Sequence, residues 1–134
     1  MGLPSIGTPV RASGKDASMW YLEWTYTDGS GAPSLDTDQS DDDPRIATPV
    51  ADGGTGITNV QFPKCDRVKV IGLNFEPPTG DLADGTDYRL VNVTERDADA
   101  GTLNVRFCDV EGSGNLLDPT SGARVCLTLL LEYP

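Results

Sequence analysis

The chain has 134 residues, which is enough for one domain with a self-sufficient core. Its 21 acidic and 10 basic residues give a formal net charge of -11, and this sign of charge repels phosphate backbones and anionic lipid headgroups. We therefore expect neither a nucleic-acid partner nor a membrane partner. The chain has no histidine, and its three cysteines are too far apart in sequence to form a zinc-ligand doublet, so we expect no metal and no cofactor.

The N-terminus begins Met-Gly-Leu-Pro-Ser, without a basic region or a continuous apolar run. This start predicts no secretory signal peptide, and no stretch of the chain approaches transmembrane length. We expect synthesis in a cytoplasm, where Cys65, Cys108 and Cys126 would stay reduced and mostly buried.

Residues 1–18 contain prolines, glycines and small residues without periodicity, which is typical of an extended arm. Such an arm gains order only from a neighbour, because it has no apolar face of its own. We predict that Leu3, Ile6 and Val10 are its partner-binding anchors.

Residues 19–27 alternate sharply and predict a strand with Trp20, Leu22, Trp24 and Tyr26 on one face. An aromatic row on such a strand is more often core or subunit interface than a platform on which sugars stack. We count Trp20, Trp24 and Tyr26 among the candidate partner-binding residues.

The range 30–54 consists of turn formers and acidic residues, and we expect a mobile acidic surface loop. Asp36, Asp38 and Ser40 have the spacing that opens a calcium-binding EF-hand loop. The match then fails, because the sixth position is Asp41 instead of glycine and the twelfth is Ala47 instead of glutamate. A solvated acidic loop is the better interpretation.

From residue 55 onward the chain shows five further period-two segments separated by turns. They cover approximately residues 58–62, 68–75, 88–95, 102–110 and 125–133. In the second of them the alternation slips by one residue between Val70 and Ile71, which predicts a β-bulge or a strand buried on both faces. Residues 96–101 form the connection of a hairpin.

The last of these segments is apolar on much of both faces, so it must be a central strand or be covered by another subunit. Together the six segments predict an all-β fold: an antiparallel β-sandwich or a squat barrel of about six strands, with an extended N-terminal arm. Residues 19–134 would form the single β-domain. The apolar final strand and the aromatic strand further predict an oligomer, most simply a trimer.

Nothing in the sequence points to ordinary catalysis, and we expect the protein not to be an enzyme. Glu23, Glu95, Glu111 and Glu132 lie on or beside predicted strands, but their spacing does not distinguish an acid–base pair from outward-facing solvated side chains. A serine or cysteine nucleophile would lack a histidine base, and the glycine-rich residues 52–56 lack the lysine and helix of a phosphate-binding loop.

Three stretches resemble small virion proteins of tailed bacteriophages. They are Thr-Asn-Val-Gln-Phe-Pro-Lys at 58–64, Arg-Val-Lys-Val at 67–70, and Leu-Asp-Pro-Thr-Ser-Gly-Ala-Arg-Val at 117–125. Capsid decoration (cement) proteins and the β-rich tips of head or tail fibres contain modules of this kind, with a strand ending in Phe-Pro and a Gly-Ala-Arg-Val turn before the last strand. The resemblance covers about residues 55–134, and the first 54 residues match no such pattern.

This resemblance implies a homotrimeric β-sandwich on the outer capsid, with no catalytic residues. We therefore expect a capsid decoration protein that is made in the host cytoplasm and bridges copies of the major capsid protein on the virion. Arms and edge strands suit that role, because they can pair across subunit boundaries. The alternative is a carbohydrate- or receptor-binding module of a fibre, which would require an exposed aromatic groove.

Overall fold

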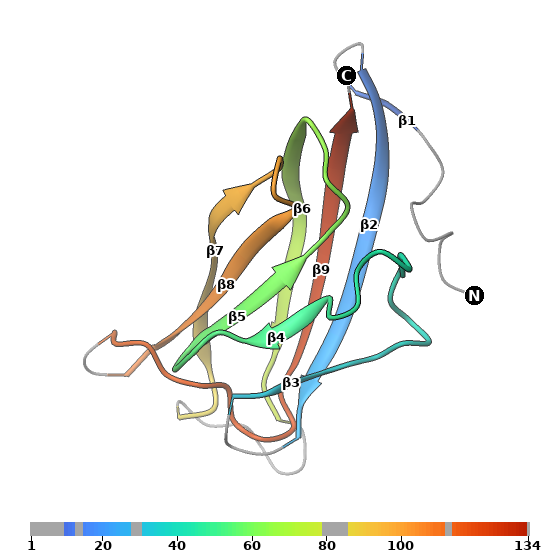
Figure 1. Ribbon diagram of the computed structural model, residues 1–134. Coiled ribbons are helices and arrows are strands. Elements are labelled where there is room, and N and C mark those ends of the chain that lie inside the picture. Colours follow the sequence, from blue (N-terminus) through green and yellow to red (C-terminus); the bar gives the residue numbers. More distant parts are fainter. Residues whose placement is uncertain (1–9, 13–14, 28–30, 79–85, 112–113, 134) are drawn as a thin grey trace.

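The computed structural model describes residues 10–12, 15–27, 31–78, 86–111 and 114–133. Two antiparallel sheets pack against each other and do not close into a barrel (Figure 1). The prediction of an all-β sandwich is therefore confirmed, and the squat barrel is excluded.

Sheet A has the strand order β1-β2-β9-β6, and β3 also pairs with β2. Its strands are β1 (Val10–Ala12), β2 (Lys15–Tyr26), β3 (Pro33–Leu35), β6 (Arg67–Glu76) and β9 (Arg124–Tyr133). Sheet B has the order β4-β5-β8-β7. Its strands are β4 (Val50–Asp52), β5 (Ile57–Gln61), β7 (Arg89–Asp97) and β8 (Thr102–Asp109).

All six predicted strands are present, as β2 and β5 to β9, and three short strands are added to them. β2 starts at Lys15, so it takes in the last four residues of the predicted arm. The predicted slip in β6 is a register shift between Val70 and Gly72 in its pairing with β9, which confirms the bulge.

The final strand, which is apolar on much of both faces, is a central strand. This was one of the two predicted alternatives, the other being cover by another subunit. β9 lies between β2 and β6 (Figure 1), and its inward side chains are completely buried. These are Val125, Leu127, Leu129 and Leu131. The chain covers this row itself, so the row no longer requires another subunit.

The aromatic row of β2 forms the centre of the core. Trp20, Trp24 and Tyr26 are each 0% exposed, and the ring of Tyr26 meets Phe107 of sheet B edge-on at 5.7 Å between centroids. Their assignment as partner-binding residues was therefore wrong: the opposite sheet covers them, and neither a protein nor a sugar reaches them in this fold. The argument for an oligomer loses this support as well.

A buried hydrogen-bond chain joins the two sheets inside this core. Trp24 Nε1 donates to the Tyr26 hydroxyl at 2.9 Å, and this hydroxyl lies 2.5 Å from Thr58 Oγ1 on β5. Burial raises the pKa of Tyr26 to about 12, so the phenol stays neutral and able to donate. The chain satisfies polar groups that would otherwise be costly to bury.

Part of the predicted acidic loop runs along the edge of β2. The amide of Asp36 donates to Glu23 O, Asp41 exchanges two hydrogen bonds with the backbone of Tyr21, and Ser40 Oγ bonds both backbone groups of Glu23. With β1 at one end and β3 at the other, this segment covers the edge of β2. Covering an edge in this way prevents unwanted strand pairing. The mobility that we expected of the loop stays a prediction.

The residues whose spacing resembles an EF-hand, Asp36, Asp38 and Ser40, belong to a turn. Asp36 Oδ1 accepts hydrogen bonds from the amides of Asp38 and Gln39, and the Ser40 hydroxyl bonds the β2 backbone. An aspartate that accepts from amides two and three residues ahead is typical of an Asx-type turn.

Candidate functional site

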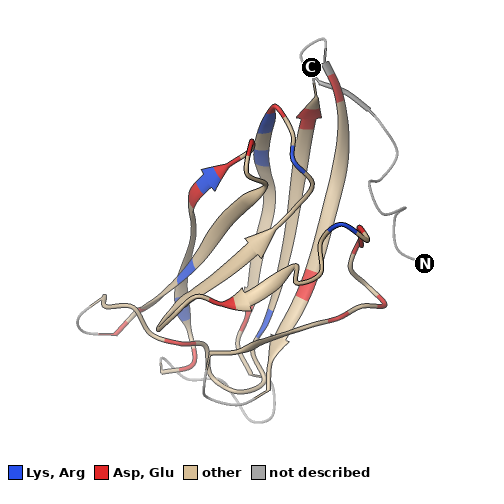
Figure 2. Cartoon of the chain, in the orientation of Figure 1, with Lys and Arg blue, Asp and Glu red and all other residues tan. Residues whose placement is uncertain are grey.

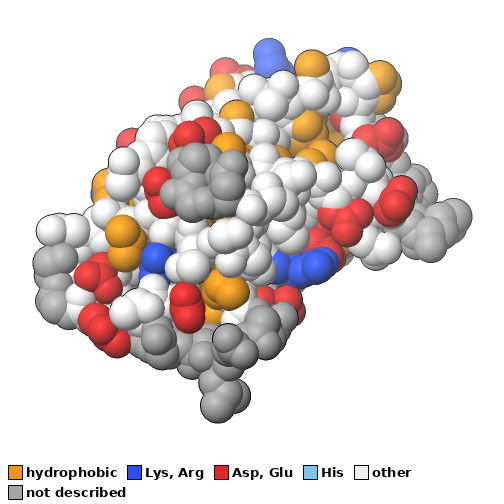
Figure 3. Space-filling view, turned by 90° about the horizontal axis from the view of Figure 1, so that it is seen from below, with side chains coloured by type: hydrophobic (Ala, Val, Ile, Leu, Met, Phe, Trp, Pro, Cys, Tyr) orange, Lys and Arg blue, Asp and Glu red, His pale blue; other side chains and the backbone are white. Residues whose placement is uncertain are grey.

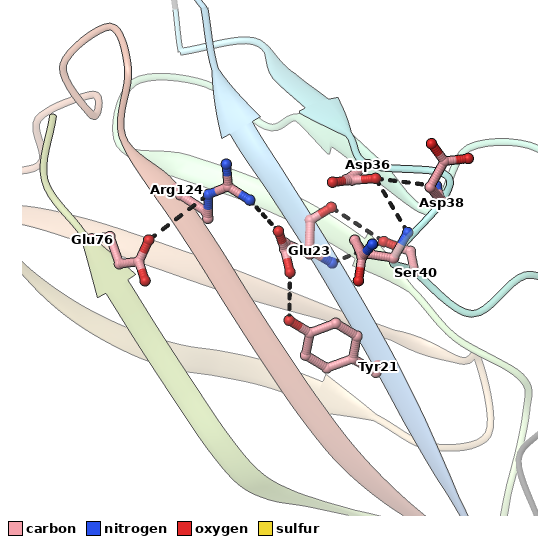
Figure 4. Close-up of polar contacts among 8 residues, drawn as sticks. Tyr21, Glu23, Asp36, Asp38, Ser40, Glu76 and Arg124 are labelled. Carbon is pink, nitrogen blue, oxygen red and sulfur yellow. Dashed lines mark hydrogen bonds and ion pairs between the residues drawn. The ribbon is translucent and has the colours of Figure 1, made fainter. Parts of the chain in front are cut away.

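Glu23 is held at the centre of a polar cluster on the outer face of sheet A (Figure 4). It forms an ion pair with Arg124 Nη1 and accepts a hydrogen bond of 2.7 Å from the Tyr21 hydroxyl. Arg124 Nε also lies 3.8 Å from Glu76 Oε2 on β6. One arginine thus compensates carboxylates from two other strands.

A second ion pair lies on the same face. Lys69 Nζ on β6 is 3.1 Å from Glu132 Oε1 on β9, and the Glu132 side chain is only 1% exposed. Lys69 is the third residue of β6, and Figure 2 shows basic positions at the upper end of this strand. A carboxylate that is buried to this degree depends on its partner, because an unpaired buried charge is costly.

The potentially reactive groups of this face are held neutral. Burial raises the pKa of Tyr21, and its contacts with Cys126 and Glu23 raise it further. Burial also raises the pKa of the Cys126 thiol, which makes the nucleophilic thiolate scarce at neutral pH. The Tyr21 phenol and the Cys126 thiol are therefore uncharged at neutral pH.

The outer face of sheet B carries an apolar row. Leu90 of β7 is opposite Cys108 of β8, and Cys108 is opposite Leu116, so the three side chains cross the face side by side. Tyr88 and Val110 flank the row at the ends of β7 and β8. We call these five residues the sheet B patch. Leu90 is 67%, Val110 48% and Tyr88 46% exposed.

Exposed apolar side chains are concentrated at this end of the molecule. Among the described residues, five large hydrophobic residues are exposed, and four of them are Tyr88, Leu90, Val110 and the adjacent Leu117. Figure 3, a view from below, shows orange side chains between the acidic ones at this lower end. A cluster of exposed apolar side chains in a soluble domain marks an interaction surface more often than scattered ones do.

Arg106 stands next to the patch on the same face of β8. It is exposed, lies opposite Ile57 on one side and Asn92 on the other, and forms no hydrogen bond or ion pair with a residue that the structure describes. Arg124 on sheet A, in contrast, is engaged with Glu23. The face thus places an apolar row next to a guanidinium that has no partner in the described part of the chain.

The rest of this face is polar and mostly uncharged. Beyond the row that contains Arg106, the following row across β5, β8 and β7 is formed by Asn59, Asn104 and Thr94. At the bulge of β7, Glu95 adopts a left-handed conformation with φ of 54°, and its carboxylate accepts a hydrogen bond of 2.7 Å from the amide of Asn104. A bulge that re-aims a side chain is common near functional surfaces.

The structure describes the backbone of only one of the three predicted anchors of the arm. Leu3 and Ile6 lie outside the described residues, and Val10 begins β1, with its backbone opposite Ala17 of β2. Our sequence reasoning missed the sheet B patch and Arg106. The available signal was Leu90 and Cys108 on the outward positions of two strands that pair through a short hairpin.

The four glutamates considered for acid–base chemistry are not brought together. Glu23 and Glu132 share a face, but the Cα partner of Glu23 is Cys126, six residues before Glu132 on β9, or about 20 Å along a strand. Glu95 lies on sheet B and Glu111 follows β8. Glycosidase carboxyl groups are about 5 to 9.5 Å apart.

The cysteines are unbonded. Cys108 is on the outer face of sheet B and Cys126 on that of sheet A, so the adjacency we considered between them does not occur. In the described part of the chain, no three His, Cys, Asp or Glu residues are grouped so that they could hold a metal ion.

Among the described residues, no helix has the length and apolar character needed to cross a membrane. Comparison of the chain with family models, with curated proteins and with solved structures finds no match.

Proposed function

We propose that the chain is a non-enzymatic structural protein of a phage virion, a capsid decoration (cement) protein, and that it docks on the major capsid protein through the sheet B patch. The observation that carries this proposal is the row of the exposed Leu90 and the half-buried Cys108 and Leu116, beside Arg106, which is unpaired among the described residues. An apolar centre with an arginine and a polar rim is the usual composition of a protein–protein interface.

The arrangement of the edges supports docking by a face. The edge of β2 is covered by β1, β3 and the segment with Ser40 and Asp41, so β2 is not open to an added strand. At β2 a partner would therefore meet side chains, whereas β4, β6 and β7 lie at the other ends of the two sheets. Side-chain surfaces of this kind give specific contacts without any reacting group.

The carbohydrate-binding alternative depended on the aromatic row of β2. Trp20, Trp24 and Tyr26 form the core, so no observation favours a sugar platform on that strand, and we do not advance this alternative.

The homotrimer that the resemblance implies stays a prediction. Its original support was the exposure of the two apolar strands, and both are buried within one chain. We assign the sheet B patch to the capsid partner and not to the trimer contact. Light scattering at micromolar concentration should give three times the mass of the 14.2 kDa chain, and a monomer mass would contradict the trimer alone.

The test compares two substitutions in virions of the phage that encodes the chain. Leu90→Asp places a charge in the patch, whereas Ile71→Asp places one on the bulge of β6 in sheet A. Both side chains are more than half exposed, so both variants should fold. We expect Leu90→Asp to lower the number of copies per virion at least 10-fold and Ile71→Asp to leave it unchanged.

Absence of the wild-type chain from purified virions would contradict the proposed function. Equal occupancy of the two variants would contradict the docking face.

A further inference from the structure

A pocket of about 220 Å³ lies at the hairpin end of sheet B, away from the sheet B patch. Three segments that are distant in sequence meet there: residues 45–46, residues 61–64 after β5, and the turn between β7 and β8. Its lining comprises Arg45, Ile46, Gln61, Phe62, Pro63, Lys64, Ala100 and Gly101. The volume is that of about seven water molecules in the liquid, which suits a group as small as one amino acid.

Three apolar residues contribute to the wall of the pocket. Phe62 is 2% exposed, Pro63 is buried and Ile46 is half-buried. Gly101 allows the hairpin turn to approach this wall: its φ is +72°, and a Cβ there would lie 2.4 Å from Phe62 O. The amide of Phe62 also donates to Gly101 O at 2.9 Å, so the two segments are fixed to each other. The pocket is therefore preformed.

Arg45 supplies a guanidinium at the pocket that is fixed in place by an ion pair with Asp43. The buried Asp43 accepts hydrogen bonds from Arg45 Nε at 2.9 Å, from Nη2 at 2.5 Å and from its backbone amide at 2.9 Å. The Arg45 side chain is nevertheless 71% exposed, and its Nη1 has no partner among the described residues. Because Asp43 holds one side of the guanidinium, the other side remains available at low entropic cost.

Lys64 supplies a second positive charge. Its Cγ would lie 3.5 Å from a Cβ on Gly101, so the aliphatic stem runs over the hairpin turn. The side chain is exposed and forms no ion pair with a described residue. Asp97 of the same turn forms no described ion pair with Lys64, and its Oδ1 accepts a hydrogen bond from the amide of Ala100.

We propose that this pocket binds a carboxylate attached to a short apolar group. Arg45 and Lys64 would contact the carboxylate, and Ile46, Phe62 and Pro63 would surround the apolar part. Asp43 balances the charge of Arg45, so Lys64 supplies the uncompensated cation and Arg45 supplies oriented N–H donors; charge-assisted hydrogen bonds to a carboxylate are among the stronger ones. The carboxylate belongs either to a free short-chain acid or to the C-terminal residue of a polypeptide. This site is separate from the docking face proposed above.

The test uses amide chemical shifts of the full chain during titration. The probes are N-acetyl-leucine, which mimics a chain end, 3-methylbutanoate, which is a free acid, and N-acetyl-leucinamide, which lacks the charge. We expect saturable shifts at Gln61, Lys64 and Gly101 with at least one acid, and at least 10-fold weaker binding of the amide. Tighter binding of N-acetyl-leucine identifies a chain end, and tighter binding of 3-methylbutanoate identifies a free acid.

Two variants and one control complete the experiment. Lys64→Glu should weaken acid binding at least 10-fold, and Ala100→Phe should block the pocket from its exposed rim. Arg67→Glu reverses an exposed cation that does not line the pocket and should bind as the wild type does. The absence of saturable shifts, equal binding of acid and amide, or equal losses in Lys64→Glu and Arg67→Glu would each overturn the proposal.

Discussion

The two outer faces of this sandwich use their polar groups in opposite ways. On sheet A, Glu23 is paired with Arg124 and Glu132 with Lys69, so these groups find their partners within the chain. On sheet B, Leu90 is exposed and Arg106 is unpaired among the described residues. A face whose charges are already paired gains little from binding, whereas an exposed leucine and a guanidinium without a described partner can gain contacts by binding. This contrast is the reason why we propose sheet B as the docking surface.

The largest expected effect lies on sheet A. Lys69→Met would leave Glu132 buried without its cation and should lower the free energy of unfolding by about 3 to 5 kcal/mol. Chemical denaturation at neutral pH measures the loss. The double variant Lys69→Met with Glu132→Gln also removes the negative charge and should recover most of the lost free energy of unfolding. If Lys69→Met is as stable as the wild type, the ion pair of Lys69 and Glu132 does not contribute to the free energy of unfolding.

A matched pair of arginines tests the contrast directly. Arg124→Ala should destabilise the fold, because Glu23, whose side chain is 12% exposed, loses its cation. Arg106→Ala should change stability by less than about 0.5 kcal/mol, because its side chain has no partner among the described residues. Thermal unfolding of both variants provides the comparison, and equal losses would remove the distinction between the faces.

A smaller, pH-dependent effect is expected for Asp43. The hydrogen bonds from Arg45 lower the pKa of Asp43 in the folded state, so the pair stabilises the protein above the unfolded-state pKa of about 4. This contribution is lost as the pH falls through the folded pKa. Asp43→Asn should therefore cost about 1 kcal/mol at pH 7, a modest value because Arg45 is largely exposed, and the difference from the wild type should shrink in acid. A difference that is constant from pH 7 to pH 3 would contradict this account.

The period-two pattern predicted the long strands because their inward residues alternate without interruption. It also located the bulge in β6, where the alternation slips. The short strands β1, β3 and β4 have three residues each and are placed by backbone pairing with a neighbour, which leaves no side-chain pattern to read. The aromatic strand was recognised, but its sequence does not say whether the covering layer belongs to the same chain.

The candidate sites were harder to predict because they arise from tertiary placement. Leu116 joins the sheet B patch through an isolated bridge to Cys108. No alternating pattern in the sequence predicts this bridge. The pocket forms where residues 45–46, 61–64 and 100–101 meet, and no local motif links these segments. The sequence shows that Arg45 and Lys64 are basic, but only the fold shows that Asp43 fixes one of them and that Gly101 brings the hairpin close to the other.

Site-specific photo-crosslinking tests the central claim most directly. Asn92 lies on the outer face of sheet B opposite Arg106, and Asn74 lies on the outer face of sheet A opposite Cys126. Both are exposed asparagines on strands, so a photoreactive residue at either position is a matched substitution. In assembled virions, we predict crosslinks to the major capsid protein from position 92 and none from position 74. Crosslinks from position 74 alone would contradict the assignment of the docking face to sheet B.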